Sequence, residues 1–283
     1  MAKFFISGFS DEISQSLDQQ IAAVKKLDMQ YIEIRGVDGK NVSELTLEEA
    51  KAVKAKLDAA GLKVSSVGSP IGKQNIKEDF APHLALFRHV LELAKILEAP
   101  YIRMFTFYVD KEELDSYRDE VIARWQAFID AAEGYDVLLC IENEKDLYGE
   151  MADRCLDVLE ALDSDKVGFI FDPANFVQAG QITYPEAFEL LGDRITYMHI
   201  KDAQLSDGKV VPAGYGDGRV PEILAELDRR EDFRCFLSLE PHLGFFKGME
   251  ALEKNMDIAS MPSGSEGLFC IAHKALTDLL EKL

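Results

Sequence analysis

Eight short apolar runs recur along this chain, and segments with helical periodicity separate most of them. Each run is four or five residues long, as at residues 31–34 and 167–171. Residues 13–27, between the first two runs, place apolar side chains at helical spacing. Parallel neighbours in a sheet need crossover connections of about this length. The alternation therefore predicts an α/β fold, a single (β/α)8 barrel.

The bounds of the predicted elements follow from the same pattern. Strands are predicted at 3–7, 31–34, 64–67, 101–105, 137–141, 167–171, 195–198 and 236–239. Helices are predicted at 13–27, 47–60, 82–97, 111–133, 151–162, 184–191 and 221–228, with Gly61 ending the second and Pro221 in the first turn of the last. Apolar segments at 249–258 and 268–280 are predicted as extra C-terminal helical segments that close the outer ring.

Length and composition narrow the class of protein. The chain has 283 residues, and one barrel of about 250 residues would use nearly all of it, so a single domain over 1–283 is expected. A formal net charge of −20 argues against a nucleic-acid partner. No apolar run approaches the ~20 residues that span a bilayer, so no membrane partner is expected. Four cysteines without CxxC spacing indicate reduced thiols and a cytoplasmic protein.

Four consecutive strands end at a polar residue of a type that binds metal ions. The fifth to eighth runs lead into Glu142, Asp172, His199 and Glu240. Taken singly, each has a simpler explanation: Asp172 precedes Pro173 in a turn, His199 is a structural hydrogen-bonding residue, and Glu240 pairs with Lys201. The C-terminal strand ends of a parallel barrel share one face, however, so the coincidence favours a metal site. Three carboxylates and one imidazole suit Mn²⁺ best, with Mg²⁺, Co²⁺ or Zn²⁺ as alternatives.

Further polar residues lie near the same strand ends. Positively charged groups there predict a neutral or singly anionic, polyhydroxylated substrate; they are Arg35, Lys73, Arg103 and Lys201. His242 and Lys201 either contact sugar hydroxyls or orient the ligands. The glycines at 214, 216 and 218 favour a flexible turn, and the alternative is a cradle of backbone amides for a substrate anion.

Several motifs resemble the xylose-isomerase-like barrel family of sugar (phosphate) isomerases and epimerases. These motifs are IENE (141–144), FDPAN (171–175), MHIKD (198–202), PAGYGDG (212–218) and SLEPH (238–242), supported by GFSDE (8–12) and SPIGK (69–73). The resemblance covers nearly the whole chain. It implies that Glu142, Asp172, His199 and Glu240 hold one divalent metal ion, with Glu142 and Glu240 also acting as acid and base.

One residue departs from the pattern of that family. Several members carry a histidine three residues after the aspartate ligand, whereas this chain has Asn175, which can bind a hydroxyl but does not titrate near neutral pH. The substrate-binding set expected here is Asn175, Lys201, Asp202, His242, Arg103 and Glu33. A DNA-repair branch of the family uses many histidines, and the five histidines of this chain and its charge disfavour that branch.

The function expected from these features is isomerisation or epimerisation of a sugar, keto-sugar or sugar phosphate through a metal-bound enediolate. Two alternatives stay open: a lyase or dehydratase acting on a keto-sugar or keto-inositol, and a non-catalytic accessory subunit. The expected partner is a small-molecule sugar, and a homo-oligomer is compatible with the sequence.

Overall fold

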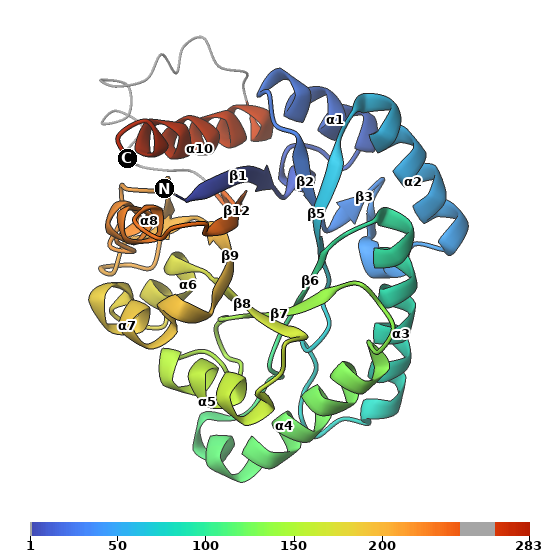
Figure 1. Cartoon of the computed structure of the whole chain (residues 1–283), viewed down its shortest axis with the longest axis vertical. Helices are drawn as coiled ribbons and strands as arrows, with labels where there is room; N and C mark the ends of the chain where they lie inside the picture. Colours follow the sequence, from blue (N-terminus) through green and yellow to red (C-terminus); the bar gives the residue numbers. More distant parts are fainter. Residues whose placement is uncertain (1, 244–263) are drawn as a thin grey trace.

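Eight parallel strands form the centre of the computed structural model, which describes residues 2–243 and 264–283. In chain order they are β1 (Lys3–Gly8), β2 (Tyr31–Ile34), β5 (Lys63–Gly68), β6 (Tyr101–Met104), β7 (Leu138–Glu142), β8 (Val167–Phe171), β9 (Ile195–Ile200) and β12 (Arg234–Leu239). From β2 onwards each strand pairs with the next, and β12 pairs with β1. An isolated parallel bridge between Phe9 and Glu33 joins the β1 and β2 edges. The predicted (β/α)8 barrel is confirmed (Figure 1).

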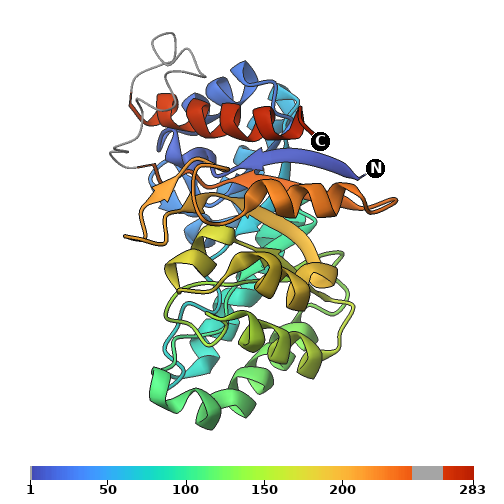
Figure 2. The ribbon, with the colours of Figure 1, turned by 90° about the vertical axis from the view of Figure 1, so that its left-hand side faces the viewer.

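Helices surround this sheet on its outer side (Figure 1, Figure 2). They are α1 (Leu17–Lys26), α2 (Leu47–Ala60), α3 (Phe80–Leu97), α4 (Leu114–Ala131), α5 (Ala152–Leu162), α6 (Pro173–Gln178), α7 (Phe188–Leu191), α8 (Val220–Asp228) and α10 (Ser265–Leu280). Short turns of 3-10 helix occur at Ser10–Glu12, Val42–Glu44, Lys111–Glu113 and Gly192–Arg194. Gly61 ends α2 at φ 75° in the left-handed region, as the sequence predicted. The helix α10 confirms one of the two predicted C-terminal segments, and the other, at 249–258, lies outside the described residues.

Two predicted helices differ from the structure. Helix α1 begins at Leu17 rather than at residue 13, because Ser10–Glu12 forms a 3-10 turn and Ser16 is extended. The predicted helix at 184–191 keeps only α7 as regular α-helix, because Tyr184 has φ −132° and ψ 128°. Two hairpins were not predicted: β3 (Gly36–Val37) with β4 (Lys40–Asn41), and β10 (Asp202–Ala203) with β11 (Val210–Val211). Two-residue strands are too short to show alternation.

Aromatic side chains close the barrel interior below its C-terminal face. The rings of Phe5, Tyr31 and Tyr101 each lie within 6 Å of Phe236, at centroid separations of 5.4, 4.9 and 5.9 Å. Tyr197 lies 5.6 Å from Phe236 and completes the layer. Side chains two residues apart on a strand share a face, so Glu33 and His199 lie one step above this layer. The lumen is therefore packed at its base and polar at its top.

Further expectations from length and composition concern the cysteines, membrane helices, cellular location and number of domains. All four cysteines are free thiols, as predicted. Among the described residues, no helix has both the length and the apolar character needed to cross a membrane. The cytoplasmic location and the single domain over 1–283 stay predictions.

Candidate metal centre

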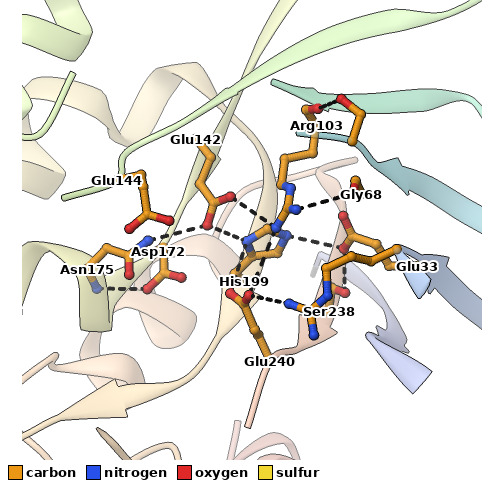
Figure 3. A network of polar contacts seen from close by, with 12 residues as sticks. Glu33, Gly68, Arg103, Glu142, Glu144, Asp172, Asn175, His199, Ser238 and Glu240 are labelled. Atoms are coloured by element: carbon orange, nitrogen blue, oxygen red, sulfur yellow. Dashed lines mark hydrogen bonds and ion pairs between the residues drawn. The ribbon is translucent and has the colours of Figure 1, made fainter. Parts of the chain in front are cut away.

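The four predicted ligands lie together at the C-terminal face of the barrel. Ligand atoms of Glu142, Asp172, His199 and Glu240 are all within 4.8 Å of one another (Figure 3). Each residue is buried, with at most 3% of its surface exposed. Glu142 ends β7, His199 lies in the last two residues of β9, and the other two directly follow β8 and β12. Parallel strands bring these positions together because their C-terminal ends share one face.

The oxygen atoms of this cluster fit a divalent cation. Glu142 Oε2 and Asp172 Oδ2 are buried and accept no hydrogen bond of good geometry among the described residues; their basic neighbours are Arg103 Nη1 at 3.5 Å and Lys201 Nζ at 3.0 Å. Clustered buried carboxylates repel one another, and a cation offsets that repulsion. His199 Nδ1 faces the same space, 2.8 Å from Glu142 Oε1. The donor set of three carboxylates and one imidazole therefore fits a hard divalent ion, with these two oxygens and Nδ1 directed at it.

Asp172 is held by both its backbone and its side chain. Its Oδ1 accepts a hydrogen bond from the Asn175 amide at 2.9 Å and so caps α6, where Pro173 occupies the first turn. The side chain of Asn143, at the end of β7, donates to the Asp172 carbonyl at 2.9 Å and accepts from the Asp172 amide at 2.8 Å. Asp172 therefore occupies the Asp-Pro turn and the candidate ligand position at the same time. The two strand ends are fixed relative to each other.

His199 is held from below by Glu33. Its Nε2 lies 3.2 Å from Glu33 Oε2, and the Phe9 ring packs edge-on at a centroid distance of 5.1 Å. Glu33 is fully buried, and Oε2 also accepts hydrogen bonds from Tyr197 and Ser238. The expectation that Glu33 binds substrate stays a prediction. Its carboxylate contacts His199 beneath the site, because Glu33 lies one step above the aromatic layer.

Three basic side chains compensate the carboxylates. Lys201 Nζ lies 3.0 Å from Asp172 Oδ2 and 2.9 Å from Glu240 Oε2. Arg35 Nη1 lies 3.1 Å from Glu240 Oε1, and Arg103 Nη1 lies 3.5 Å from Glu142 Oε2 and 3.9 Å from Glu240 Oε1. The Arg103 guanidinium also packs against the rings of Phe9 and Phe105, at 4.9 Å from each centroid. Arg103 lies in β6, and Arg35 and Lys201 directly follow β2 and β9.

Burial and mutual charge shift the pKa values of the cluster. Burial raises the pKa of Asp172 to about 7, although the Lys201 ammonium opposes this. Burial by itself would lower the pKa of His199, but the charges of Glu142 and Glu33 outweigh it and raise the pKa to about 10. Burial opposes ionisation of Glu240 too, yet Lys201 and His199 hold its pKa well below its usual range. Glu240 is therefore ionised at neutral pH, as a carboxylate ligand of a metal ion must be.

His242 and Asn175 were also expected to bind substrate, and they differ in exposure. His242 is half exposed, with Nε2 3.1 Å from Glu12 Oε1 and 3.6 Å from Glu240 Oε1, so it borders the site. Asn175 is buried and donates to Glu142 Oε1 at 3.3 Å and to the Asn143 carbonyl at 2.9 Å. Its amide hydrogens are thus directed to the protein.

Asp202 has a structural position. Its carboxylate accepts hydrogen bonds from the backbone amides of Gly214, Gly216 and Gly218 at 3.0, 3.0 and 2.7 Å. The expected substrate contact of Asp202 stays a prediction; in this structure Asp202 is fully buried and fixes the glycine loop. The same bonds exclude the alternative in which these three amides cradle a substrate anion. A Cβ on Gly216 would lie 2.4 Å from Asp202 Oδ1, which accounts for the glycine.

Some residues of the site were not singled out from the sequence. Asn143 was included only within the IENE motif, and Ser238 and Tyr197 were not recognised as polar neighbours of Glu33. The alternation of side chains is the signal that finds the last two, because Ser238 shares a face with Glu240 and Tyr197 with His199. No comparable signal finds Glu12, which reaches the site from a 3-10 turn.

A family model described as xylose isomerase-like TIM barrel matches residues 21–257 of this chain. The chain belongs to this family. The family assignment agrees with the eight-stranded parallel barrel and with the resemblance seen in the motifs.

Individual relatives show the range of activities within similar folds. The 3-oxo-isoapionate decarboxylase of Pectobacterium atrosepticum is 33% identical over 115 residues, which is 40% of this chain and 38% of the relative. The match thus spans well under half of that relative. The crystal structure of the IolI protein with a bound zinc atom has a TM-score of 0.74 at 18% identity, covering 98% of both chains. D-psicose 3-epimerase from Clostridium cellulolyticum H10, solved with D-tagatose, has a TM-score of 0.69 at 15% identity and covers 98% of both chains. At these identities the two solved structures show a shared fold.

Proposed function

We propose that this protein is a divalent-metal-dependent enzyme that moves a proton next to the carbonyl of a sugar or keto-sugar, as an isomerase or epimerase. The observation that carries the proposal is the buried cluster of Glu142, Asp172, His199 and Glu240, whose ligand atoms all lie within 4.8 Å of one another. An accessory protein without turnover would have no need of this arrangement. The family contains enzymes of several reaction types, and the site geometry supports this one best.

The proposed cofactor is one divalent ion, Mn²⁺ first, with Mg²⁺, Co²⁺ or Zn²⁺ as alternatives. A bound cation polarises a carbonyl oxygen and stabilises the negative charge that develops when a neighbouring C–H loses its proton. The bound zinc in the IolI structure supports a metal in this fold. Among the residues of this chain, His199 would bind through Nδ1 because Nε2 is directed at Glu33.

Glu142 and Glu240 are the proposed acid and base. In the sheet order β12, β9, β8, β7, their strands lie on either side of the two that carry His199 and Asp172. The two carboxylates therefore approach a bound substrate carbon from different sides. One glutamate removes the proton from carbon to give an enediolate, and the other returns a proton to the opposite face, which inverts the centre. If one glutamate performs both transfers between adjacent carbons, the outcome is aldose–ketose isomerisation.

Arg103, Lys201 and His242 are the proposed substrate contacts. Arg103 Nε is buried and has no hydrogen-bond partner among the described residues. Lys201 and His242 both lie next to Glu240. A hydroxyl or a single carboxylate can accept hydrogen bonds from these groups. The proposed substrate is therefore a small polyhydroxylated molecule, neutral or singly anionic.

The decarboxylase relative supports a second candidate, a lyase acting on a 3-keto sugar acid. In that reaction the bond to the carboxyl carbon breaks, its electron pair enters the enolate of the neighbouring ketone, and carbon dioxide leaves. A glutamate then protonates the carbon. The buried guanidinium of Arg103 is suited to hold the substrate carboxylate before the bond breaks. Both candidates need the same stabilised enolate and use the same ligands.

Deuterium exchange separates these candidates from a protein without activity. The Mn²⁺-loaded protein is incubated in D₂O with a panel of ketoses, 3-keto-glycosides and 3-keto sugar acids, and deuterium incorporation and carbon dioxide release are both measured. Isomerase or epimerase activity gives incorporation into a ketose or 3-keto-glycoside without carbon dioxide. Lyase activity gives carbon dioxide with deuterium in the product.

Glutamine variants test the two-glutamate assignment. Glu142→Gln and Glu240→Gln are each expected to lose at least about 100-fold in kcat, since each removes a proton-transfer group, with exchange surviving in at most one of them. Asp172→Asn serves as the control for metal content, which should fall sharply while the far-UV circular dichroism spectrum is unchanged. Full turnover by either glutamine variant at unchanged metal content would contradict the mechanism.

A further inference from the structure

A buried hydrogen-bonded network lies directly under the candidate metal centre. Glu33 Oε2 accepts a hydrogen bond from Ser238 Oγ at 2.6 Å and faces His199 Nε2 at 3.2 Å (Figure 3). It also accepts a hydrogen bond from Tyr197 Oη at 2.9 Å. All four residues are fully buried. The three polar groups come from β12 and β9 and converge on a carboxylate from β2. These three protein groups therefore fix the position of Glu33 Oε2.

The network continues below Glu33 to a β-bulge. The register between β2 and β5 shifts after Ile32, so that Glu33 lies opposite Ser66 and Ser65 is the additional residue. Ser65 Oγ donates to the Ile32 carbonyl at 3.1 Å and lies 2.9 Å from Tyr197 Oη and 2.6 Å from Ser7 Oγ. Bulges re-aim side chains next to functional sites. Here the bulge places a hydroxyl against Tyr197, which orients the phenol that donates to Glu33.

This network ends inside the barrel. Ser7 is fully buried, and the aromatic layer around Phe236 lies below it. A path that carries protons would need an end at solvent, and the network of described residues has none on this side. A fixed scaffold for the His199 ring is the role that its geometry allows.

We propose that Glu33 is a positioning residue for the metal centre, which accepts the Nε2 hydrogen of His199 and so presents Nδ1 to the cation. This inference rests on the proposed metal-dependent function. A carboxylate bonded to the far nitrogen of a ligand histidine fixes its tautomer and ring orientation and increases its basicity as a ligand. Tyr197 and Ser238 in turn fix the carboxylate.

If Glu33 had a purely structural role, its replacement would lower metal affinity only to the extent that it lowers stability. The bridge that joins the β1 and β2 edges at Phe9 and Glu33 uses backbone atoms, so the barrel does not need a carboxylate at this position. Removing one partner of a buried charge pair usually lowers stability, so a loss of stability alone does not identify the role of Glu33. Metal affinity and stability therefore need to be measured on the same variants.

The experiment measures the affinity of the metal-free protein for Mn²⁺ alone by isothermal titration calorimetry, with thermal unfolding of each apo variant. Glu33→Leu is expected to weaken Mn²⁺ binding by about 10- to 100-fold. Glu33→Gln, which keeps a carbonyl acceptor, should lose less, and Tyr197→Phe less again. Ser7→Ala, at the far end of the same network, is the matched control and should bind like the wild type. In the zinc-loaded wild type, ¹⁵N NMR should find His199 protonated at Nε2.

The outcomes separate this inference from the proposed function. Wild-type protein that binds neither Mn²⁺ nor Zn²⁺ overturns both. If the wild type binds and Asp172→Asn does not, while Glu33→Leu and Glu33→Gln bind with wild-type affinity, the metal function stands and the role of Glu33 is wrong. An affinity loss that follows the loss of thermal stability across the variants, Ser7→Ala included, would also overturn it. If Glu33→Leu fails to fold, the role of Glu33 is tested by the Mn²⁺ affinities of Glu33→Gln and Tyr197→Phe and by the NMR measurement.

Discussion

At the scale of single residues, Lys201 has the closest charged contacts with the proposed ligands. Its ammonium lies about equally close to Asp172 and Glu240, at 3.0 and 2.9 Å. Burial by itself would lower the pKa of Lys201, but these two carboxylates raise it above its ordinary value. Lys201 therefore stays charged and compensates the site in the metal-free protein.

Replacing Lys201 tests this compensation. Lys201→Met should lower the free energy of unfolding by about 3–5 kcal/mol in EDTA, because it removes the buried positive charge that lies between Asp172 and Glu240. In saturating Mn²⁺ the loss should be smaller, and the affinity for Mn²⁺ should be equal to or greater than that of the wild type. Urea unfolding with and without the metal, together with calorimetry, measures both. A fall in Mn²⁺ affinity as large as that of Asp172→Asn would instead make Lys201 necessary for metal binding.

At the scale of elements, the loop after β5 is fixed against the end of β6. The Gly72 amide donates to His83 Nε2 at 2.8 Å, and the Gly72 carbonyl accepts from the Phe107 amide at 2.9 Å. Gly72 has φ 91°, and a Cβ there would lie 2.0 Å from the Phe105 carbonyl oxygen. The loop also carries Lys73, whose Nζ packs on the Phe105 ring and pairs with Glu144 at 2.7 Å. The loop that carries Lys73 therefore needs a glycine at position 72.

Substitution of two glycines separates the steric clash from backbone strain. Gly134 has a similar φ of 82°, but a Cβ at that position would meet nothing within 4 Å. Gly134→Ala should cost about 1–2 kcal/mol for the left-handed conformation. Gly72→Ala should cost about 3 kcal/mol or more, because the clash with backbone adds to the strain. Equal losses in chemical denaturation would show that the loop moves to accept the methyl group.

At the scale of the whole molecule, the proposed metal site links four neighbouring strands. Its ligands come from the ends of β7, β8, β9 and β12, which make up half of the barrel. A ligand that binds the folded state alone stabilises that state by mass action. The proposed cation should therefore stabilise the barrel as a unit.

Removal and return of metal ions test this coupling. At a free Mn²⁺ concentration of about 100 times Kd, the stabilisation should be about 2.7 kcal/mol, which corresponds to a rise in Tm of roughly 5 °C for a chain of this size. EDTA should reverse the shift. The control variant Asp172→Asn should unfold at the same temperature with and without Mn²⁺. A wild-type Tm that does not respond to any of the four proposed ions would contradict the metal site.

The sequence by itself determined the strands, most helices and the positions of the four candidate ligands. The reason is that these features are local: short apolar runs mark buried strands, and a polar residue at the end of such a run marks the barrel face. Glu142, Asp172, His199 and Glu240 each follow this rule on their own strand. Parallel pairing then places them together without further information.

The tertiary structure alone decided what Glu33 and Asp202 contact. Glu33 lies 166 positions from His199 and 205 from Ser238 along the chain, and Asp202 finds its partners in a loop 12 to 16 residues later. Which acceptor meets which donor depends on register, on the bulge between β2 and β5, and on how the barrel closes. These are properties of neighbouring strands in space, and a pattern read along one strand does not contain them.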